Sequence, residues 1–444
     1  MFPQPIYDEI AALVGAENVS QTEADRAQHM RDASSFDGGR PDLVVWPENS
    51  KQVSQVVVIA NREKMPIVGW GAGSGIEGNN VPIKGGIIVD FVRHMNRIVE
   101  IHENDFQVTV QPGIFYRDMN KLLSRHGIFF PPDPGANASV GGMIANNAAG
   151  SRTVKYGATR DNVLALEVVL ASGEIVRTGS RSVKQSAGYD LTHLFTGSEG
   201  TLGLITEATL KLYPVAEHVS AVMCALPNVQ AAADAVYGII GSGLNPAALE
   251  LVDAPTAKVL IEAEGFDIEQ QPNLFMEFNG ASETALKEEL KLVEEICGEC
   301  GSLRFEAGIG WDARNHLWEA RHRLFETMVR YFGTEKWLVT DVAVPISNYP
   351  ELVGYTADTV AELGLNGGLI GHAGDGNLHA CIFYNVDDHA IKEKVDLLNE
   401  QMVTKALALG GTSTGEHGVG LGKKRFMEAE HGPALTLMKQ IKAT

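Results

Sequence analysis

The segment GWGAGSGIEGNN, residues 69–80, follows the apolar run MPIVGW and decides which fold the first half of the chain can adopt. Five of its first ten residues are glycine, so backbone N–H groups can turn toward one anion without interference from Cβ atoms. Residues 73–78 also fit GxGxxG, but a Rossmann fold needs that loop to open a helix. Here residues 79–86, NNVPIKGG, lead to another strand pattern. The segment therefore predicts a pyrophosphate-binding loop outside the Rossmann fold, with tight hairpins as the alternative.

Two more glycine clusters follow in the same half of the chain. Residues 131–163, PPDPGANASVGGMIANNAAGSRTVKYGATRDNV, combine glycines with small residues and amides, and residues 197–207, GSEGTLGLITE, lie between strand patterns. Small side chains let a planar ligand lie against the backbone, while Ser139, Asn146 and Asn147 offer hydrogen bonds to phosphate or ring edges. Such segments are poor hydrophobic cores and suitable walls for a cofactor.

These three clusters, in this order and spacing, resemble the FAD-binding domain of vanillyl-alcohol-oxidase-type flavoproteins over about residues 37–216. The resemblance implies that the first cluster holds the pyrophosphate, the second lines the adenosine and flavin, and the third completes the pocket. The cofactor-binding residues that it implies are Gly71, Ala72, Gly73, Ser74, Gly75, Ile76, Ser139, Gly141, Gly142, Asn146, Asn147, Gly150, Glu199, Gly200 and Ile205. Relatives that attach flavin covalently use a histidine in or near the first loop. Because this loop has none, we expect non-covalent FAD.

Length and composition limit the remaining possibilities. A chain of 444 residues is too long for one ordinary hydrophobic core, and no segment approaches the roughly 20 apolar residues that span a bilayer. The net charge of −20 argues against a nucleic-acid partner. The first residues lack the features of a signal or transit peptide, and four cysteines fit a reducing compartment. We therefore expect a cytoplasmic protein, with peripheral attachment to a membrane as a further option.

The pattern along the chain predicts an α+β protein of two domains. A helical preface, residues 1–36, precedes the strand-rich FAD-binding domain, residues 37–216. In residues 217–444 strands alternate with helices, which predicts a second α+β domain; the motifs described below indicate that it binds substrate and metal. Cys297 and Cys300 form a CxxC without a second cysteine pair, so we interpret it as chance or helix packing.

The second half contains a candidate metal site. His372 and His379 flank the turn in GHAGDGNLH, where glycines and an aspartate favour a sharp reversal that can bring the two imidazoles together. Glu416 and His417 lie in the glycine-rich loop GEHGVG. Two histidines and one carboxylate suit zinc, manganese or iron and leave coordination positions open for substrate. The alternatives are hydrogen-bonding or surface histidines and a surface turn.

Four motifs carry a second resemblance: WEARH from residue 318, TDVAVPIS from residue 340, GHAGDGNLH from residue 371 and TGEHGVG from residue 414. Together they resemble the C-terminal domain of FAD-linked D-lactate dehydrogenases, including glycolate oxidase and D-2-hydroxyglutarate dehydrogenase relatives. The resemblance implies that His372, His379 and Glu416 hold a divalent metal, zinc or manganese. It also implies that His417 is the catalytic acid/base.

From these features we expect FAD-dependent oxidation of a D-2-hydroxy acid by hydride transfer to flavin. Arg321 lies on one helical face with Trp318 and Phe325 and is expected to grip the substrate carboxylate, with a surface salt bridge as the alternative. Lys336 is a weaker catalytic candidate. Asp341 is expected to orient a ligand imidazole.

Cys381 stands two positions beyond the second metal histidine, where relatives that favour dicarboxylates carry a polar residue. The resemblance therefore favours D-lactate and similar monocarboxylates over glycolate and, last, D-2-hydroxyglutarate. Members of the family usually continue past MKQIK into a Leu-Asp-Pro and Asn-Pro-Gly-Lys tail, whereas this sequence ends at Thr444. We interpret this end as a trimmed or absent tail.

The sequence has no cysteine set for an iron–sulfur cluster. Reduced flavin is therefore expected to pass electrons to an external acceptor such as a cytochrome, a quinone or an electron-transfer flavoprotein. A homodimer is a further expectation. The alternatives are the catalytic subunit of a glycolate oxidase, a D-2-hydroxyglutarate dehydrogenase, a non-catalytic flavin-binding subunit and a metallohydrolase.

Overall fold

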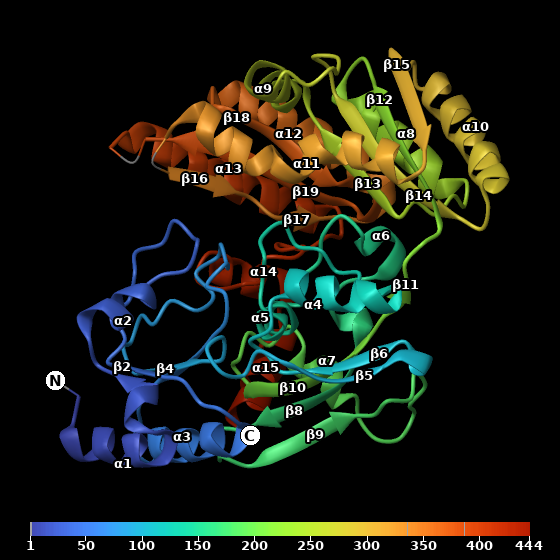
Figure 1. Ribbon diagram of the computed structural model, residues 1–444. Helices are drawn as coiled ribbons and strands as arrows, with labels where there is room; N and C mark the ends of the chain where they lie inside the picture. The colour runs from blue at the N-terminus through green and yellow to red at the C-terminus, as the bar shows by residue number, and fades with distance from the viewer. Residues whose placement is uncertain (1, 335, 386) are drawn as a thin grey trace. The chain divides into compact units, whose positions relative to one another are not determined.

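The computed structural model describes residues 2–334, 336–385 and 387–444, which form two compact units (Figure 1). Unit 1 contains the chain up to Ala149, Gly157–Val215 and Glu416–Thr444. Unit 2 contains Gly150–Tyr156 and Ala216–Gly415. Both units combine helices with sheets, which confirms the predicted α+β class.

The first sheet of unit 1 is mixed and has the strand order β1-β2-β4-β3. Its strands are β1 (Val19–Ser20), β2 (Leu43–Val45), β3 (Ile67–Trp70) and β4 (Ile87–Asp90). Helices α1 (Gln4–Val14) and α3 (Ser50–Arg62) share its core, in which Ile10 and Val53 are fully buried. A shorter helix, α2 (Glu23–Gln28), lies between β1 and β2 in the chain. The helical preface is therefore part of this core.

The glycine loop after Trp70 connects β3 to β4, which run parallel to each other. Residues 71–86 are all described and contain no helix. This arrangement confirms that the loop does not open a helix as a Rossmann fold requires.

The second sheet of unit 1 is antiparallel, with the order β5-β6-β10-β8-β9. Its strands are β5 (Ile98–His102), β6 (Gln107–Val110), β8 (Val163–Val169), β9 (Ile175–Gly179) and β10 (Leu204–Lys211). Helices whose apolar residues share its core are α4 (Tyr116–Leu123), α5 (Val140–Asn146) and α7 (Leu191–Phe195). A small sheet pairs β7 (Ile128–Phe129) with β11 (Tyr213–Pro214).

Unit 2 is built on one antiparallel sheet with the order β15-β12-β14-β13-β18-β19-β16, in which β19 also pairs with β17. Its strands are β12 (His218–Ala225), β13 (Ala248–Val252), β14 (Asn273–Gly280), β15 (Arg304–Ile309), β16 (Lys336–Val339), β17 (Val342–Ala343), β18 (Gly367–His372) and β19 (Asn377–Tyr384).

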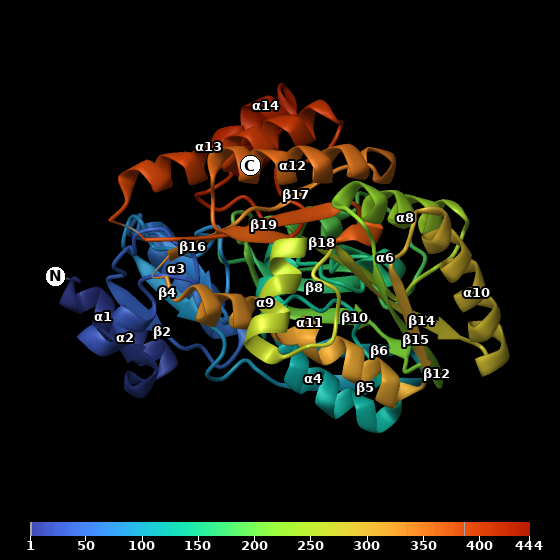
Figure 2. The ribbon, with the colours of Figure 1, turned by 90° about the horizontal axis from the view of Figure 1, so that it is seen from above.

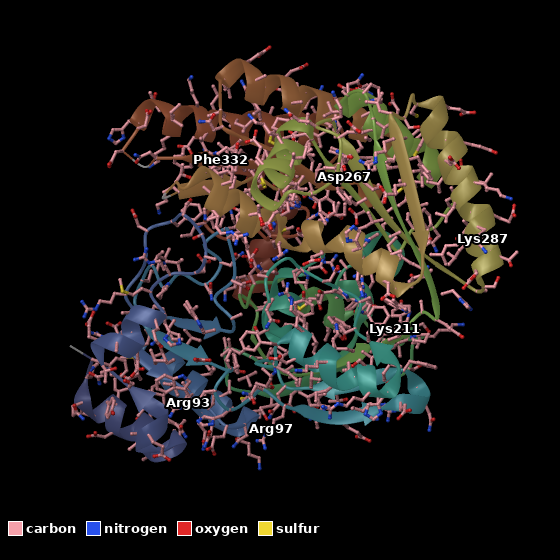
Figure 3. All side chains as sticks on the ribbon, turned by 45° about the horizontal axis from the view of Figure 1, so that its top comes forward. Arg93, Arg97, Lys211, Asp267, Lys287 and Phe332 are labelled. Atoms are coloured by element: carbon pink, nitrogen blue, oxygen red, sulfur yellow. The ribbon has the colours of Figure 1, made fainter. Side chains whose placement is uncertain are left out.

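Helices cover both faces of this sheet. On one face lie α9 (Ala254–Glu264) and α11 (Trp311–Phe332), which ends at Phe332 (labelled in Figure 3). The Phe332 ring stacks on Phe383 of β19 with ring centroids 4.7 Å apart. The other helices are α8 (Val229–Gly241), α10 (Glu283–Glu299), α12 (Tyr349–Leu363) and α13 (His389–Ala408). Of these, α12 and α13 lie side by side (Figure 2). No helix in the described ranges has the length and apolar composition that a membrane span needs.

The CxxC pair lies at the end of α10. Cys297 is fully buried, Cys300 is half-buried just beyond the helix, and neither forms a disulfide. These positions agree with helix packing.

The compact units differ from the sequence-based domains in two segments. Residues 150–156, which we placed in the FAD-binding domain, contain α6 (Thr153–Tyr156) and pack with unit 2. The Tyr156 hydroxyl there accepts a hydrogen bond from Asn279 Nδ2 at 2.9 Å.

The second segment is the C-terminal one. Residues 416–444, which we placed in the substrate domain, pack with unit 1. In Figure 1 their helices, α14 (Met427–His431) and α15 (Ala434–Ala443), are red among the blue and green elements of that unit. Long-range hydrogen bonds hold this segment in unit 1. The Glu199 carboxylate accepts from the backbone amides of Val419 and Gly420, which lie 220 and 221 residues away in the chain.

Candidate active site

The predicted histidine turn is a hairpin of unit 2. Strand β18 ends at His372, a short 3-10 turn follows, and β19 carries His379. Gly376 closes the turn with a φ of 79°, a conformation that favours glycine. The two imidazole centroids are 5.3 Å apart and their planes are 83° apart. The turn therefore brings the two imidazoles together.

Both imidazoles are held through the same ring nitrogen. His372 Nδ1 lies 2.6 Å from Glu250 Oε1, and His379 Nδ1 lies 2.9 Å from the carbonyl oxygen of Thr340. Since these oxygens accept, each Nδ1 carries a proton, and in the neutral imidazole each Nε2 then presents a lone pair. Imidazoles that bind metals show this pattern, in which a carboxylate or carbonyl fixes the ring from behind.

Glu250 is a functional residue that the sequence analysis missed. It lies on β13, is fully buried, and binds Arg321 through Oε2, which accepts from Nε at 3.0 Å and also from Nη2. Burial raises the pKa of Glu250, but His372 and Arg321 outweigh it and hold the pKa below its usual range. A lone acid inside the apolar strand AALELV was the signal that could have indicated it, because buried carboxylates need charged partners.

Arg321 reaches the sheet from α11, where Trp318 is buried and Phe325 is partly buried in the same core. Its ion pair with Glu250 is largely buried, with side chains 16% and 0% exposed. The alternative of a surface salt bridge is therefore wrong. The Nε and Nη2 contacts occupy one edge of the guanidinium, so a substrate carboxylate would use donors on the Nη1 side.

Lys336 begins the edge strand β16 and pairs with Tyr384. His379 lies five residues earlier on β19, which corresponds to roughly 17 Å of strand. Side chains alternate along a strand, so Tyr384 and its partner Lys336 point to the face opposite that of His379. The register therefore does not bring Lys336 to the imidazoles, and its catalytic role stays a prediction.

Asp341 lies beside the His379 imidazole, but a backbone carbonyl is closer to it. Its Oδ1 lies 3.7 Å from His379 Nδ1, and the Thr340 carbonyl is closer to that nitrogen. Asp341 is fully buried, and its Oδ1 accepts a hydrogen bond from Asn377 Nδ2 at 2.8 Å. The backbone next to Asp341 thus orients the ring.

Asp341 also holds the chain just before Glu416. Its Oδ2 accepts a hydrogen bond from Thr414 Oγ1 at 2.7 Å. A Cβ on Gly415 would lie 2.4 Å from Asn377 Nδ2 and 3.0 Å from Asp341 Oδ1. Gly415, the last residue of unit 2, therefore packs tightly against the base of β19.

Glu416 and His417 open the C-terminal segment of unit 1. Glu199 holds this segment, because its carboxylate accepts hydrogen bonds from Val419 N at 2.6 Å and Gly420 N at 2.9 Å. Glu199 was expected to line the cofactor. In the structure its oxygens bind the loop that carries the predicted base.

Two amide side chains hold His417 itself. Asn79 Nδ2 and Asn146 Nδ2 each donate to the His417 carbonyl oxygen at 3.2 Å. The His417 ring lies beside Glu416, with Nε2 and Oε1 3.5 Å apart. Asn146 was expected to bind the cofactor, and Asn79 was missed although it follows the first glycine loop.

The first two glycine clusters meet at Gly71 and Ser139. A Cβ on Gly71 would lie 2.0 Å from Ser139 Oγ, so any larger residue would displace that hydroxyl. Ser139 caps α5 by accepting from Gly142 N at 3.4 Å, and Asn147 ends that helix in the left-handed region. The hydroxyl of Ser139 therefore has a structural role as the cap of α5.

Two further observations fit a bound polar cofactor in unit 1. Asn147 and Glu199 have φ values of 53° and 51°, and such strained residues gather at functional sites. Among the described residues, no hydrogen-bond partner meets the buried side-chain oxygens of Asn79 and Asn80. Residues 71–76 are half-buried, whereas Ile205 is 8% exposed and belongs to the core of the second sheet.

Comparison with known families matches both halves of the chain. The family described as FAD linked oxidases, C-terminal domain, matches residues 215–444. The family described as FAD binding domain matches residues 41–179.

Relatives cover nearly the whole chain. A probable mitochondrial D-lactate dehydrogenase of Danio rerio is 39% identical over 99% of this chain and 89% of the relative. A mitochondrial D-lactate dehydrogenase [cytochrome] of Arabidopsis thaliana is 37% identical over 100% and 78%. A glycolate oxidase subunit, GlcD, of Bacillus subtilis is 36% identical over 100% and 94%.

Solved structures show the same fold at low identity. An alkyldihydroxyacetonephosphate synthase has a TM-score of 0.76 at 19% identity, over 100% of this chain and 83% of that chain. The 4-ethylphenol oxidase of Gulosibacter chungangensis has a TM-score of 0.77 at 17% identity, over 99% and 93%. These likenesses support the predicted vanillyl-alcohol-oxidase-type fold.

Proposed function

The chain belongs to the family of FAD-linked oxidases, and on that premise we propose that it oxidises D-lactate to the corresponding 2-oxo acid. It is an FAD-dependent oxidoreductase, as predicted from the three glycine clusters. The observation that carries the substrate proposal is the pair His372 and His379, with each Nδ1 engaged and the rings 5.3 Å apart. Such a pair can hold a metal for a chelating 2-hydroxy acid.

FAD would lie against the three glycine clusters of unit 1, with Gly71–Ile76 at the pyrophosphate and Ser139–Gly150 along the adenosine and flavin. Bound FAD supplies the acceptor for the hydrogen and electron pair that leave substrate C2. We propose that it is held without a covalent bond. Precipitation with acid should release all the flavin into the supernatant, and flavin left on the polypeptide would refute this.

The metal, zinc or manganese, would be held by His372, His379 and Glu416. Support for Glu416 comes from the chain itself, because Gly415 is packed at the base of β19 and consecutive Cα atoms are only about 3.8 Å apart. A bound divalent metal supplies a Lewis acid for the substrate hydroxyl. Substitution His372→Ala should abolish the metal content of the purified protein.

The residues around the substrate have separate tasks. His417 accepts the hydroxyl proton at a ring nitrogen, since an imidazole titrates near neutral pH. Arg321, anchored by Glu250, binds the substrate carboxylate with donors on the Nη1 side. We expect His417→Ala to keep FAD and to lose its reduction by substrate. Unchanged reduction would exclude His417 as the base.

The residue at position 381 supports a substrate with a small tail. Cys381 is 2% exposed, and burial raises the pKa of its thiol to about 12. A thiol is neutral or negative, so it offers no positive charge to a second carboxylate. This favours D-lactate over D-2-hydroxyglutarate.

A second candidate is the catalytic subunit of a glycolate oxidase. The Bacillus subtilis glycolate oxidase subunit supports it, since it aligns with all of this chain at 36% identity. The name of the Arabidopsis thaliana relative supports a cytochrome as the electron acceptor. A quinone or an electron-transfer flavoprotein, a homodimer and a cytoplasmic location stay predictions.

One experiment tests the proposal. The metal-replete protein is titrated under anaerobic conditions with D-lactate, L-lactate, glycolate and D-2-hydroxyglutarate while flavin absorbance is recorded. We expect D-lactate to bleach the flavin at the lowest concentration and L-lactate to leave it oxidised. Preferential bleaching by glycolate would favour the second candidate, and failure of every D-2-hydroxy acid would refute the dehydrogenase assignment.

A further inference from the structure

The sheet of unit 2 places a glutamate directly beside a predicted metal ligand. Strands β13 and β18 are antiparallel, and Glu250 is the Cα partner of His372 in their register. Side chains at paired positions lie on the same face of a sheet. The backbone therefore holds the Glu250 carboxylate next to the His372 imidazole before any ligand binds.

Glu250 divides its two oxygens between two partners. Oε1 lies 2.6 Å from His372 Nδ1, while Oε2 accepts from Nε and Nη2 of Arg321. The Glu250 side chain is fully buried, so neither contact competes with bulk water. Arg321 comes from α11, which covers this face of the sheet. The Glu250 carboxylate thus contacts both Arg321, which we expect to bind the substrate carboxylate, and His372, a predicted metal ligand.

A neighbouring glutamate shows what an ordinary buried pair looks like here. Glu277 on β14 is 2% exposed and accepts a hydrogen bond from Arg314 Nε of α11 at 2.8 Å. On the neighbouring strand β13 its Cα partner is Ala248, whereas the Cα partner of Glu250 on β18 is His372. Glu277 resembles Glu250 in burial and in its arginine partner, but no described contact joins it to an imidazole.

We propose that Glu250 is a positioning residue that sets the ring orientation and proton location of His372 and anchors the Nε edge of Arg321. A carboxylate at Nδ1 keeps the proton on that nitrogen, directs Nε2 outward as a ligand and increases its basicity. The Arg321 guanidinium is fixed at the same time, because two of its donors end on the other carboxylate oxygen. The proposal deepens the metal-assisted function proposed above and rests on it.

The test measures metal binding without turnover. Metal-free wild type, Glu250→Gln, Glu277→Gln and His372→Ala are titrated with Mn²⁺ alone in competition with a chelating dye. Loss of such a supporting contact costs about 10- to 100-fold in metal affinity. We therefore expect a 10- to 100-fold weaker Mn²⁺ affinity for Glu250→Gln and wild-type affinity for the matched control Glu277→Gln.

The outcomes separate the two proposals. If His372→Ala loses Mn²⁺ but Glu250→Gln binds like wild type, the role of Glu250 is refuted and the metal site stands. Equal losses in Glu250→Gln and Glu277→Gln also refute it, because they show a general effect of breaking a buried pair. If His372→Ala binds Mn²⁺ like wild type, the proposed metal site itself fails, and the role of Glu250 fails with it.

Glu250→Gln leaves the charge of Arg321 without its partner, which can prevent folding. The double variant Glu250→Gln with Arg321→Gln removes both charges and keeps two hydrogen-bonding side chains. The same 10- to 100-fold loss of Mn²⁺ affinity is expected for it. Wild-type affinity in a folded double variant would refute the proposal.

Discussion

The attachment of the His417 loop to Glu199 can be tested by removing the carboxylate. Val419 N and Gly420 N donate to Glu199 at 2.6 and 2.9 Å. A hydrogen bond to a charged group contributes about 1.5–3 kcal/mol. Glu199 is half-buried, so the lower value of about 1.5 kcal/mol applies to each of these two hydrogen bonds. Glu199→Ala should therefore destabilise the attached conformation of the His417 loop by about 3 kcal/mol. Ala and Glu have the same Cβ, so strain at the left-handed φ of 51° is unchanged.

The expected result is faster amide exchange in the loop. Since about 1.4 kcal/mol corresponds to a factor of ten, Glu199→Ala should speed exchange at Val419 and Gly420 roughly 100-fold. Glu199→Gln keeps one acceptor oxygen, and neutral hydrogen bonds contribute about 1 kcal/mol, so its effect should be smaller. Hydrogen–deuterium exchange of peptides that cover residues 414–424 measures both.

The control is Glu207→Gln in the same unit. Glu207 pairs with Arg177, whose side chain is 69% exposed, so the pair should contribute little. Exchange in the loop should match wild type in this variant. If Glu199→Ala also exchanges at the wild-type rate, the carboxylate does not hold the loop and the reasoning is wrong.

Three other predictions follow from single contacts. Burial raises the pKa of Asp253 from 3.8 to about 6, so its neutral, protonated carboxyl group makes its full contribution to stability only below about pH 4. That contribution, about 3 kcal/mol, is lost as the pH rises through 6, and Asp253→Asn should be more stable than wild type at pH 7 in urea unfolding but not at pH 4. Gly71→Ala, whose Cβ would lie 2.0 Å from Ser139 Oγ, should lower the flavin-to-protein absorbance ratio at least tenfold, and an added Ser139→Gly should restore part of it. Burial lowers the pKa of His29, but Asp90 and a backbone carbonyl outweigh it and raise the pKa above 6.5. Charged His29 therefore stabilises the fold below about pH 6.5 and loses this effect at higher pH, so thermal melts of wild type and His29→Gln should converge as the pH rises.

Features that depend on neighbouring residues in the chain were predictable from the sequence. The hairpin between His372 and His379 needs only glycines, an aspartate and a strand pattern, and these are visible in a short window. The absence of a helix after the first glycine loop was visible in the same way. Both patterns act over fewer than about ten residues, where local conformational preference dominates.

Features that depend on distant residues were not predictable. Glu250 meets His372 across 122 residues and Arg321 across 71 residues. The strand pattern around Glu250 shows that the position is buried but gives no partner. The packing of the C-terminal segment with unit 1 was not visible for a similar reason, because Glu199 binds Val419 across 220 residues. The contacts that Asn146 and Glu199 make with the His417 loop were likewise not visible, and their predicted role in cofactor binding stays a prediction.

The contact between Glu250 and Arg321 changes how a substitution of Arg321 should be interpreted. Arg321→Ala removes a proposed substrate clamp, but it also leaves the buried Glu250 carboxylate with His372 as its remaining described partner. A buried charge that loses one of its two partners costs free energy, and it interacts more strongly with the partner that remains. The imidazole would then be drawn more strongly to Glu250, and metal binding would change together with substrate binding. Loss of activity in Arg321→Ala therefore identifies a clamp only where the Mn²⁺ affinity of the same variant equals that of wild type.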